Sequence, residues 1–516
     1  MPPPSDIRMQ DSSPPKRRAG GRQARHRHRA IGPPNPAPPG QIGGQYQPLT
    51  EPQMRAIYDT ARRLLDRLGM GDVPDRLRDD LVKAGARGSG ARVTFPEPLV
   101  EDAIAGAAKR FWLHGRDKGR SIEVGGDAVH FGTGGAAVQT LDLETGLYRP
   151  STLRDLHDFT RLQDTLTNVS WFTRCCIATD LPDTFALDVN TAYALIRNTT
   201  KPTATAFTLA KNVAPIMSML ERAAGPEGFA ARPFMKAHIS PVISPMRYGE
   251  DAVDVVYECI RHGIPISCIT AAQSGATAPA TLAGFLAMSL AETLASLVMV
   301  HAIKPGFPMI FSNWPLVIDL RTGAFAGGGG EIAVLNAASA QLSNWLGLPS
   351  GVASSMTDAK AIDAQYGAEK GITALAAGLA GGNLVYESAG MTASLLGASF
   401  EAFVLDDEML GAVYRILRGI EVTEDTLAYD AICATVLGEG HFLGASQTQD
   451  AMERDYLYPR LADRMTPSAW ADAGAPTAWQ RANAEARRIL ETHHPGHLDP
   501  ETDAAIRAAF PMILPA

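Results

Sequence analysis

The sequence predicts an α/β fold, a (β/α)8 TIM-like barrel with an N-terminal helical lead-in and a C-terminal helical extension. Strand-like runs alternate with helical periodicity eight times over roughly 290 residues, as in such a barrel. The small and apolar run 351–356 is followed by polar residues, the pattern of a buried parallel strand that ends at a pocket. The Gly-rich turn 132–135 leads into AVQTLDLETG, which looks like a hairpin and not like the helix of a dinucleotide-binding open sheet. The barrel is therefore favoured over a doubly wound sheet.

The expected strands and helices alternate along the chain. Strands are expected at 129–133, 168–179, 203–209, 233–240, 264–270, 308–313, 351–356 and 383–388. Helices are expected at 151–166, 185–198, 213–224, 249–262, 279–302, 331–346, 368–379 and 400–417. Ser151 stands where an N-cap belongs, and Gly263 and Gly347 stand where helices end.

Four regions follow from these elements. Residues 1–48 are rich in Pro, Gly and Arg and lack apolar periodicity, so we expect a disordered basic arm. Residues 49–125 form the helical lead-in, 126–419 the barrel, and 420–516 the α-helical extension. Seven of the 47 Lys and Arg residues lie between Lys16 and Arg29. No interleaved aromatic residues or recognition helix accompany these basic residues. Docking onto another subunit or an acidic partner is therefore favoured over binding to nucleic acid.

Composition excludes several classes of protein. Hydrophobic residues make up 45% and charged residues 20% of the chain, as in ordinary globular proteins. The longest apolar region, 278–303, is interrupted by Ser289, Glu292 and Ser296, so it predicts a core helix and not a membrane span. No signal-peptide pattern opens the chain, and we expect a cytoplasmic protein. The five cysteines have no metal-binding spacing, so we expect neither a metal site nor disulfides.

Aromatic and acidic residues collect where the expected strands end, which is where barrels of this type place their active sites. Aromatic faces combined with a few anions suit a quaternary ammonium ion, because that cation offers no hydrogen-bond donor. Any one of these aromatic residues is also compatible with core or lid packing. The residues are Phe207, Trp314, Tyr366, Tyr386, Asp180, Asp358 and Glu387.

A run of four glycines precedes the expected helix 331–346. Backbone amides at Gly329 and Gly330 are candidates for holding an anion, such as the phosphate of a nucleotide-like tail. A flexible loop that simply starts a helix is the more common meaning of such a run.

Ordered motifs along nearly the whole chain resemble the trimethylamine methyltransferase family, the corrinoid-dependent amine methyltransferases. The motifs are NTTKP (198–202), SPMRYGED (244–251), GATAPATLAG (275–284), DLRTGAF (319–325), NAASAQL (336–342), TDAKAIDAQ (357–365), LAGGN (379–383) and LADRMTPSAW (461–470). The resemblance implies a TIM-like barrel that moves a methyl group from an amine to the Co(I) of a corrinoid carried on a separate protein. No tightly bound cofactor is then expected.

The resemblance also narrows the substrate. The archaeal trimethylamine enzymes of the family carry pyrrolysine, expected near TDAK, whereas Asp358 to Ala361 are ordinary residues here. This is similar to the non-pyrrolysine branch, whose members act on quaternary amines such as glycine betaine. After Gly440–Leu443 the family often has His-Thr, whereas this chain has Gln447 followed by Thr448, so substrate range or activity differs if that histidine matters.

These considerations give the predicted roles. Asp358 and Glu387 are the expected catalytic residues, steering and holding the cation beside the aromatic side chains. Lys360, Arg174 and His238 are candidates for meeting a substrate carboxylate. The expected partners are a corrinoid protein, a small quaternary amine and further copies of the chain. A non-catalytic betaine-binding or sensing protein and a trimethylamine methyltransferase remain the alternatives.

Overall fold

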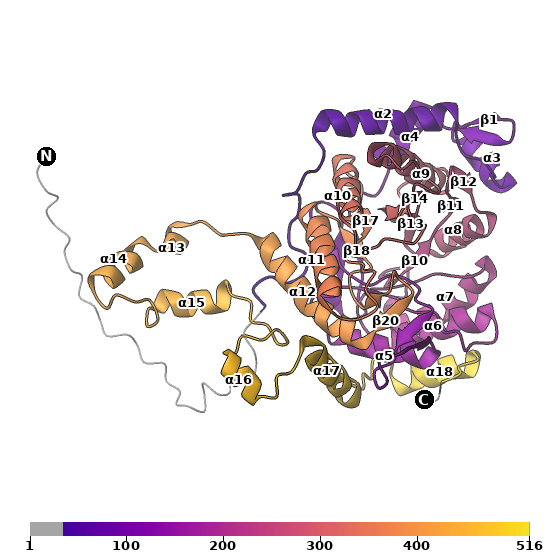
Figure 1. Ribbon diagram of the computed structural model, residues 1–516. Coiled ribbons are helices and arrows are strands. Elements are labelled where there is room, and N and C mark those ends of the chain that lie inside the picture. The colour runs from indigo at the N-terminus through magenta and orange to yellow at the C-terminus, as the bar shows by residue number, and fades with distance from the viewer. Residues whose placement is uncertain (1–34, 515–516) are drawn as a thin grey trace, which may run out of the picture. The chain divides into compact units, whose positions relative to one another are not determined.

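The computed structural model describes residues 35–514, and in it eight parallel strands close into a barrel (Figure 1). The sheet runs in the order β5-β18-β17-β15-β13-β10-β9-β8, and a parallel bridge between Gly132 and Trp171 joins its two edges. The strands are β5 (His130–Phe131), β8 (Phe172–Thr173), β9 (Thr203–Thr205), β10 (Met235–Ile239), β13 (Ile266–Thr270), β15 (Met309–Asn313), β17 (Ser350–Ala353) and β18 (Leu384–Tyr386). The predicted (β/α)8 barrel is confirmed, and each strand overlaps an expected run.

Helices follow the strands and surround the barrel. They are α5 (Leu153–Asp164), α6 (Thr184–Asn198), α7 (Val213–Ala224), α8 (Glu250–His262), α9 (Leu282–Ile303), α10 (Gly330–Trp345), α11 (Ala364–Leu379) and α12 (Phe400–Arg418). The N-cap of α5 is Thr152 and not Ser151, because Thr152 exchanges hydrogen bonds with Asp155 in a capping box. Gly263 ends α8 in the left-handed conformation, at a φ of 71°, as expected.

Further short strands form small sheets outside the eight-stranded barrel sheet. A four-stranded sheet in the order β19-β20-β6-β7 is built from segments that follow β5 and β18. In it β6 and β7 pair antiparallel, which confirms the hairpin expected after the glycine turn. The short strands are β6 (Gln139–Leu141), β7 (Tyr148–Pro150), β11 (Val242–Ile243), β12 (Arg247–Tyr248), β14 (Gln273–Ser274), β16 (Leu316–Val317), β19 (Met391–Thr392) and β20 (Gly397–Ser399).

The lead-in covers helix α9. Its elements are α2 (Glu51–Arg67), α3 (Asp75–Lys83), β1 (Arg87–Ser89), β2 (Arg92–Thr94), α4 (Glu97–Ala105), β3 (Phe111–Leu113) and β4 (Ile122–Val124). The three helices α2, α3 and α4 all pack on α9, which also packs on β13 and β15. By length and composition α9 is apolar enough to cross a membrane, but 83% of its most apolar window is buried inside the structure. It is a core helix, as expected.

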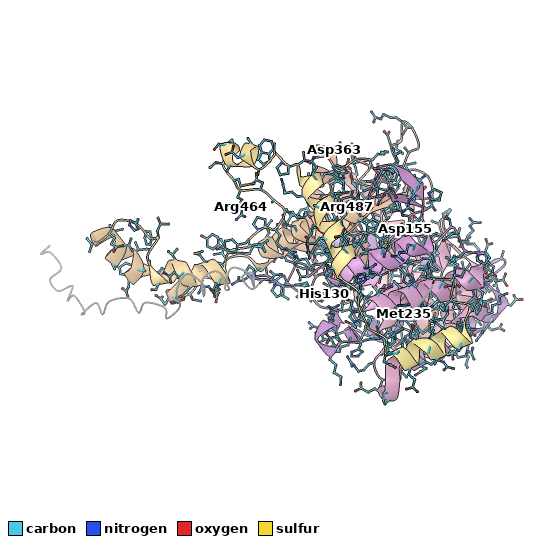
Figure 2. The ribbon with its side chains drawn as sticks, turned by 90° about the horizontal axis from the view of Figure 1, so that it is seen from below. His130, Asp155, Met235, Asp363, Arg464 and Arg487 are labelled. Atoms are coloured by element: carbon cyan, nitrogen blue, oxygen red, sulfur yellow. The ribbon has the colours of Figure 1, made fainter. Side chains whose placement is uncertain are left out.

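Contacts divide the described chain into two units. Among the described residues, one unit contains Pro38–Arg418 together with 459–514, and the other contains Gly419–Tyr458 with 35–37. The expected extension 420–516 is thus shared between the two units, and residues 1–34 of the expected arm lie outside the described residues. In the first unit α17 packs on α12 and α5, and Figure 2 labels Arg487 on α17 and Asp155 on α5. The remaining helices are α13 (Glu424–Leu427), α14 (Tyr429–Leu437), α15 (Ser446–Arg454), α16 (Pro467–Asp472), α17 (Ala478–Thr492) and α18 (Pro500–Ala509).

Candidate functional site

A cavity of about 340 Å³ lies at the carboxyl ends of β8, β9 and β10, against the first turns of α8. Arg174, Phe207 and His238 line it, so three of the predicted substrate-binding residues meet in one place. They come from three consecutive strand ends, which is where a parallel barrel directs its loop residues. Asp251 of α8 adds a carboxylate to the same wall.

The Arg174 guanidinium makes no hydrogen bond or ion pair with another side chain in the described part of the chain. The nearby carboxylate of Asp188 is engaged elsewhere: it accepts hydrogen bonds from the Thr208 amide at 2.7 Å and hydroxyl at 2.7 Å, and from Asn212 at 2.8 Å. Burial lowers the pKa of Arg174, and Asp188 partly offsets this effect. Because the pKa of an arginine starts above 12, its side chain remains a cation that can meet an anionic ligand.

An aromatic cluster adjoins this cavity through His238. The His238 ring is 5.2 Å from the ring of Trp314 and 5.7 Å from that of Tyr386, edge to face in both cases. Trp314 and Tyr386 are 4.8 Å apart, and Trp171 packs on Tyr386 at 4.5 Å. Burial, followed by the charges of Lys236 and Arg174, lowers the pKa of His238 well below its usual value. The imidazole is therefore a neutral aromatic group at pH 7.

Lys236, which the sequence analysis did not select, lies inside the barrel beneath this cluster. Its ammonium nitrogen donates to the Tyr386 hydroxyl at 2.8 Å and lies 4.6 Å from the Tyr386 ring centre and 4.9 Å from that of Trp171. Burial lowers the pKa of Lys236 well below its usual value. The hydrogen bond from Lys236 holds the Tyr386 ring in place from inside the barrel. The available signal was the lysine in the otherwise apolar run FMKAHI.

Glu387 follows β18 and is completely buried. Neither of its carboxylate oxygens has a hydrogen-bond partner of good geometry among residues 35–514. Burial raises the pKa of Glu387 to about 8, against smaller lowering effects of the Gly135 amide and Lys370. Its φ of 63° is strained for a residue with a side chain, and such strain is concentrated at functional sites. A Cβ at Gly134 would stand 2.6 Å from Glu387 Oε1, which explains the glycine there.

Further polar atoms at the strand ends lack partners within the described residues. Buried polar groups are normally hydrogen-bonded, so such a set marks a place where a ligand or water binds. The atoms are Nδ1 of His238, Oγ1 of Thr270, Oγ of Ser312, Oδ1 of Asn313 and Nε1 of Trp314. They lie at the ends of β10, β13 and β15, which extends the site across the mouth of the barrel.

Asp358 lies apart from the cluster and holds the glycine loop. Its carboxylate accepts hydrogen bonds from the Gly327 amide at 2.8 Å, the Gly328 amide at 3.3 Å and the Ser394 hydroxyl at 2.8 Å. Gly329 is the N-cap of α10 and Gly330 its first residue. A protein carboxylate thus already occupies the amides that precede the expected anion site.

Three other predicted residues also lie apart from the aromatic cluster. The exposed Lys360 donates to the backbone oxygen of Asp358 at 2.7 Å. The Tyr366 hydroxyl, on α11, donates to Asp406 of α12 at 2.6 Å. The exposed Asp180 accepts from the Leu153 amide at the start of α5, at 2.9 Å.

The fold and the site thus define a (β/α)8-barrel protein whose mouth combines a cavity-lining guanidinium, an aromatic cluster and a buried carboxylate. The profile of the family "Trimethylamine methyltransferase (MTTB)" matches residues 18–511, and this chain belongs to that family. Membership makes it an enzyme of the methyltransferase class.

Characterised relatives cover most of the chain. A glycine betaine methyltransferase of Desulfitobacterium hafniense is 30% identical over 91% of this chain and 97% of its own length. A trimethylamine methyltransferase of the same species is 30% identical over 89% of this chain and 92% of its own length. A trimethylamine methyltransferase of Methanosarcina barkeri is 32% identical over 79% of this chain and 82% of its own length.

Proposed function

We propose that this enzyme takes a methyl group from a quaternary amine that carries a carboxylate, with glycine betaine as the best candidate. The acceptor in this proposal is the Co(I) of a corrinoid carried on a separate protein, as the resemblance implies. The observation that carries the proposal is the Arg174 guanidinium, which has no side-chain partner among residues 35–514 and lines a cavity that adjoins the aromatic cluster. The buried Glu387 directly follows Tyr386 of that cluster in the chain. The five free cysteines suit a reducing compartment, so we place the enzyme in the cytoplasm.

The ammonium end of the donor is assigned to the aromatic cluster. Trp314 and Tyr386 offer ring faces, and a quaternary ammonium is held by such faces without any hydrogen bond. Glu387 supplies the countercharge once it ionises, and its oxygens have no hydrogen-bond partner of good geometry among residues 35–514. The lowered pKa of His238 keeps its imidazole uncharged beside the aromatic cluster.

The carboxylate end is assigned to Arg174. A guanidinium binds a carboxylate through two parallel hydrogen bonds, which fixes both position and direction. Held at that end, a betaine directs its ammonium group away from Arg174, and the N–CH3 bond can be presented in line with the acceptor. Trimethylamine and choline have no carboxylate and cannot use this contact.

The residues present are sufficient for the chemistry of a quaternary donor. The bond between nitrogen and the methyl carbon breaks, its electron pair stays on nitrogen, and the amine leaves as a neutral tertiary amine. The new bond joins the methyl carbon to cobalt, and the electron pair of Co(I) supplies it. No proton has to be delivered to the leaving group, so the site needs to bind, orient and exclude water.

Methyl transfer to a reduced corrinoid protein tests the proposal. With glycine betaine, the spectrum is expected to change from Co(I) to methyl-Co(III), whereas choline and trimethylamine give little or no change. Arg174→Leu is expected to abolish most betaine turnover, whereas the control Arg222→Leu, an exposed arginine on α7, leaves it unchanged.

Three results would contradict the proposal. Betaine binding without methyl transfer would indicate the non-catalytic protein, and turnover of trimethylamine alone would indicate the other substrate class. Unchanged betaine turnover in Arg174→Leu would remove the assigned carboxylate contact.

A further inference from the structure

The segment Gly419–Tyr458, here called the acidic segment, exposes an unusual number of large apolar side chains. None of the residues of α13, α14 and α15 is buried. Ile420 is 89% exposed and Leu443 is 85% exposed. The other exposed apolar side chains are Val422, Leu427, Tyr429, Ile432, Val436, Leu437, Phe442, Met452, Tyr456 and Tyr458. Large exposed apolar surfaces mark interaction sites in soluble proteins.

Helix α14 carries a continuous part of this surface. Tyr429, Ile432 and Val436 recur at intervals of three and four residues, so they form one stripe along the helix. They are 72%, 45% and 67% exposed, respectively. A stripe of this kind is the face by which a helix normally packs on another helix.

The same segment has a strongly negative charge. It contains eight acidic residues and one basic residue, Arg454. The acidic residues are Glu421, Glu424, Asp425, Asp430, Glu439, Asp450, Glu453 and Asp455. Two acidic segments that met through their stripes alone would therefore repel each other. A partner that covers this surface has to bring positive charge as well as an apolar face.

The chain itself contains the complementary charge. The stretch from Lys16 to Arg29, here called the basic stretch, has seven Lys and Arg residues and no acidic residue. It has no apolar side chain larger than alanine. It can neutralise the acidic segment, but it cannot cover the α14 stripe. When two copies of the chain meet, the basic stretches match the charge and the two stripes match the apolar surface.

We propose that the acidic segment is the contact between two copies of this chain. The α14 stripes of the two copies pack on each other, and the basic stretch of each copy lies against the acidic residues of the other. The contact is isologous, with the same patch used on both sides, so it closes at two chains. None of its residues is assigned to the proposed substrate site, so its test does not depend on the reaction.

Light scattering of the full chain after size exclusion tests the contact. The wild-type mass is expected at twice the chain mass of 54.9 kDa. Ile432→Glu combined with Val436→Glu is expected to give single chains, because both residues are exposed and the change places charge in the stripe. The matched control, Ile372→Glu on α11, replaces a side chain that is 62% exposed elsewhere and is expected to leave the mass unchanged. Circular dichroism checks that all variants are folded.

The ionic part of the proposal has its own test. Deleting residues 1–34, or reversing charge with Glu424→Lys and Asp425→Lys, is expected to raise the dissociation constant at least tenfold. Raising the salt concentration from about 0.1 M to about 1 M should have a similar effect, because the screening length falls from about 10 Å to about 3 Å. The control Asp75→Lys with Asp79→Lys, on the exposed side of α3, should change nothing.

Either part can be overturned. A wild-type chain that stays single at every concentration, or a mass unaffected by the changes at Ile432 and Val436, would refute the contact. An unchanged dimer after deletion of residues 1–34 would refute the role of the basic stretch in joining two copies. If the wild-type chain is monomeric and begins to aggregate after that deletion, the basic stretch covers the acidic segment of its own chain. This result would contradict the proposal.

Discussion

Binding of a betaine is predicted to depend on pH through Glu387. The carboxyl is buried without partners, and its pKa of about 8 means that it is mostly protonated at pH 7 while the site is empty. A quaternary ammonium favours the ionised form, so binding has to release this proton. The apparent dissociation constant at pH 7 is then about tenfold above its value at pH 9, because one pH unit below the pKa costs a factor of about ten.

Titration calorimetry of glycine betaine between pH 6 and 9 measures this dependence. Near pH 7, repeating the titration in buffers of different ionisation enthalpy should show about one proton released per betaine bound. In Glu387→Gln the binding should be weaker and nearly independent of pH. Burial raises the pKa of Glu292 to about 7, so this residue also titrates in the range. The part of the pH dependence of binding that is lost in Glu387→Gln is therefore the part due to Glu387.

A second substitution supplies the control. Asp358→Asn removes a carboxylate that holds the glycine loop, and it should leave the pH slope as in the wild type. A flat wild-type profile, or the same slope in Glu387→Gln, would refute the assignment of Glu387 to the cation.

The raised pKa also affects stability. The pKa of Glu387 is higher in the folded state than in the unfolded state. The free energy of unfolding therefore falls as the pH rises from about 4.5 to about 8, because the unfolded chain loses this proton first. Glu387→Gln should therefore unfold at a higher temperature than wild type at pH 9, and the difference should shrink towards pH 4.5.

Three other substitutions probe the packing around the site. Gly132→Ala puts a Cβ 2.1 Å from the Trp171 ring and should cost about 3 kcal/mol of unfolding free energy in urea titrations. Asp358→Ala removes the carboxylate that accepts two hydrogen bonds from the glycine loop and one from Ser394. It should cost about 2 kcal/mol and speed proteolysis between residues 318 and 330. Lys370→Met leaves the buried Asp406 carboxylate without its cation, which lies 2.9 Å away, and should lower the free energy of unfolding by about 3–5 kcal/mol. Adding Asp406→Leu should restore most of the lost stability in thermal unfolding.

The barrel was predictable because parallel strands buried on both faces form short apolar runs, and the helices between them have their own period. The details of helix ends were less accessible. Ser151 and Thr152 both suit an N-cap, and only the reciprocal bonds with Asp155 distinguish them. Sequence periodicity does not say which of two adjacent hydroxyls takes the extended conformation.

The site was predictable where a residue ends or directly follows a strand. Trp314 directly follows β15, Tyr386 is the last residue of β18, and the two meet in one cluster. Tyr366 comes later after its strand, within the first turn of α11, and its ring packs towards α12 instead. Lys236 sits within β10, where sequence alone does not tell whether a side chain faces the barrel interior or the helices. Loop length and strand orientation, and not residue type, determine which of the predicted residues lie together in the site.

The covering of α9 by the lead-in has a consequence during synthesis on the ribosome. Helices α2, α3 and α4 emerge first, and their apolar faces, with Met54, Ile57 and Leu65 on α2, have no partner until α9 has been made. That partner comes after half of the barrel, so the earliest part of the chain must stay unaggregated while five barrel strands are translated. Translation that pauses before residue 282 would therefore lengthen the interval in which these apolar faces have no partner.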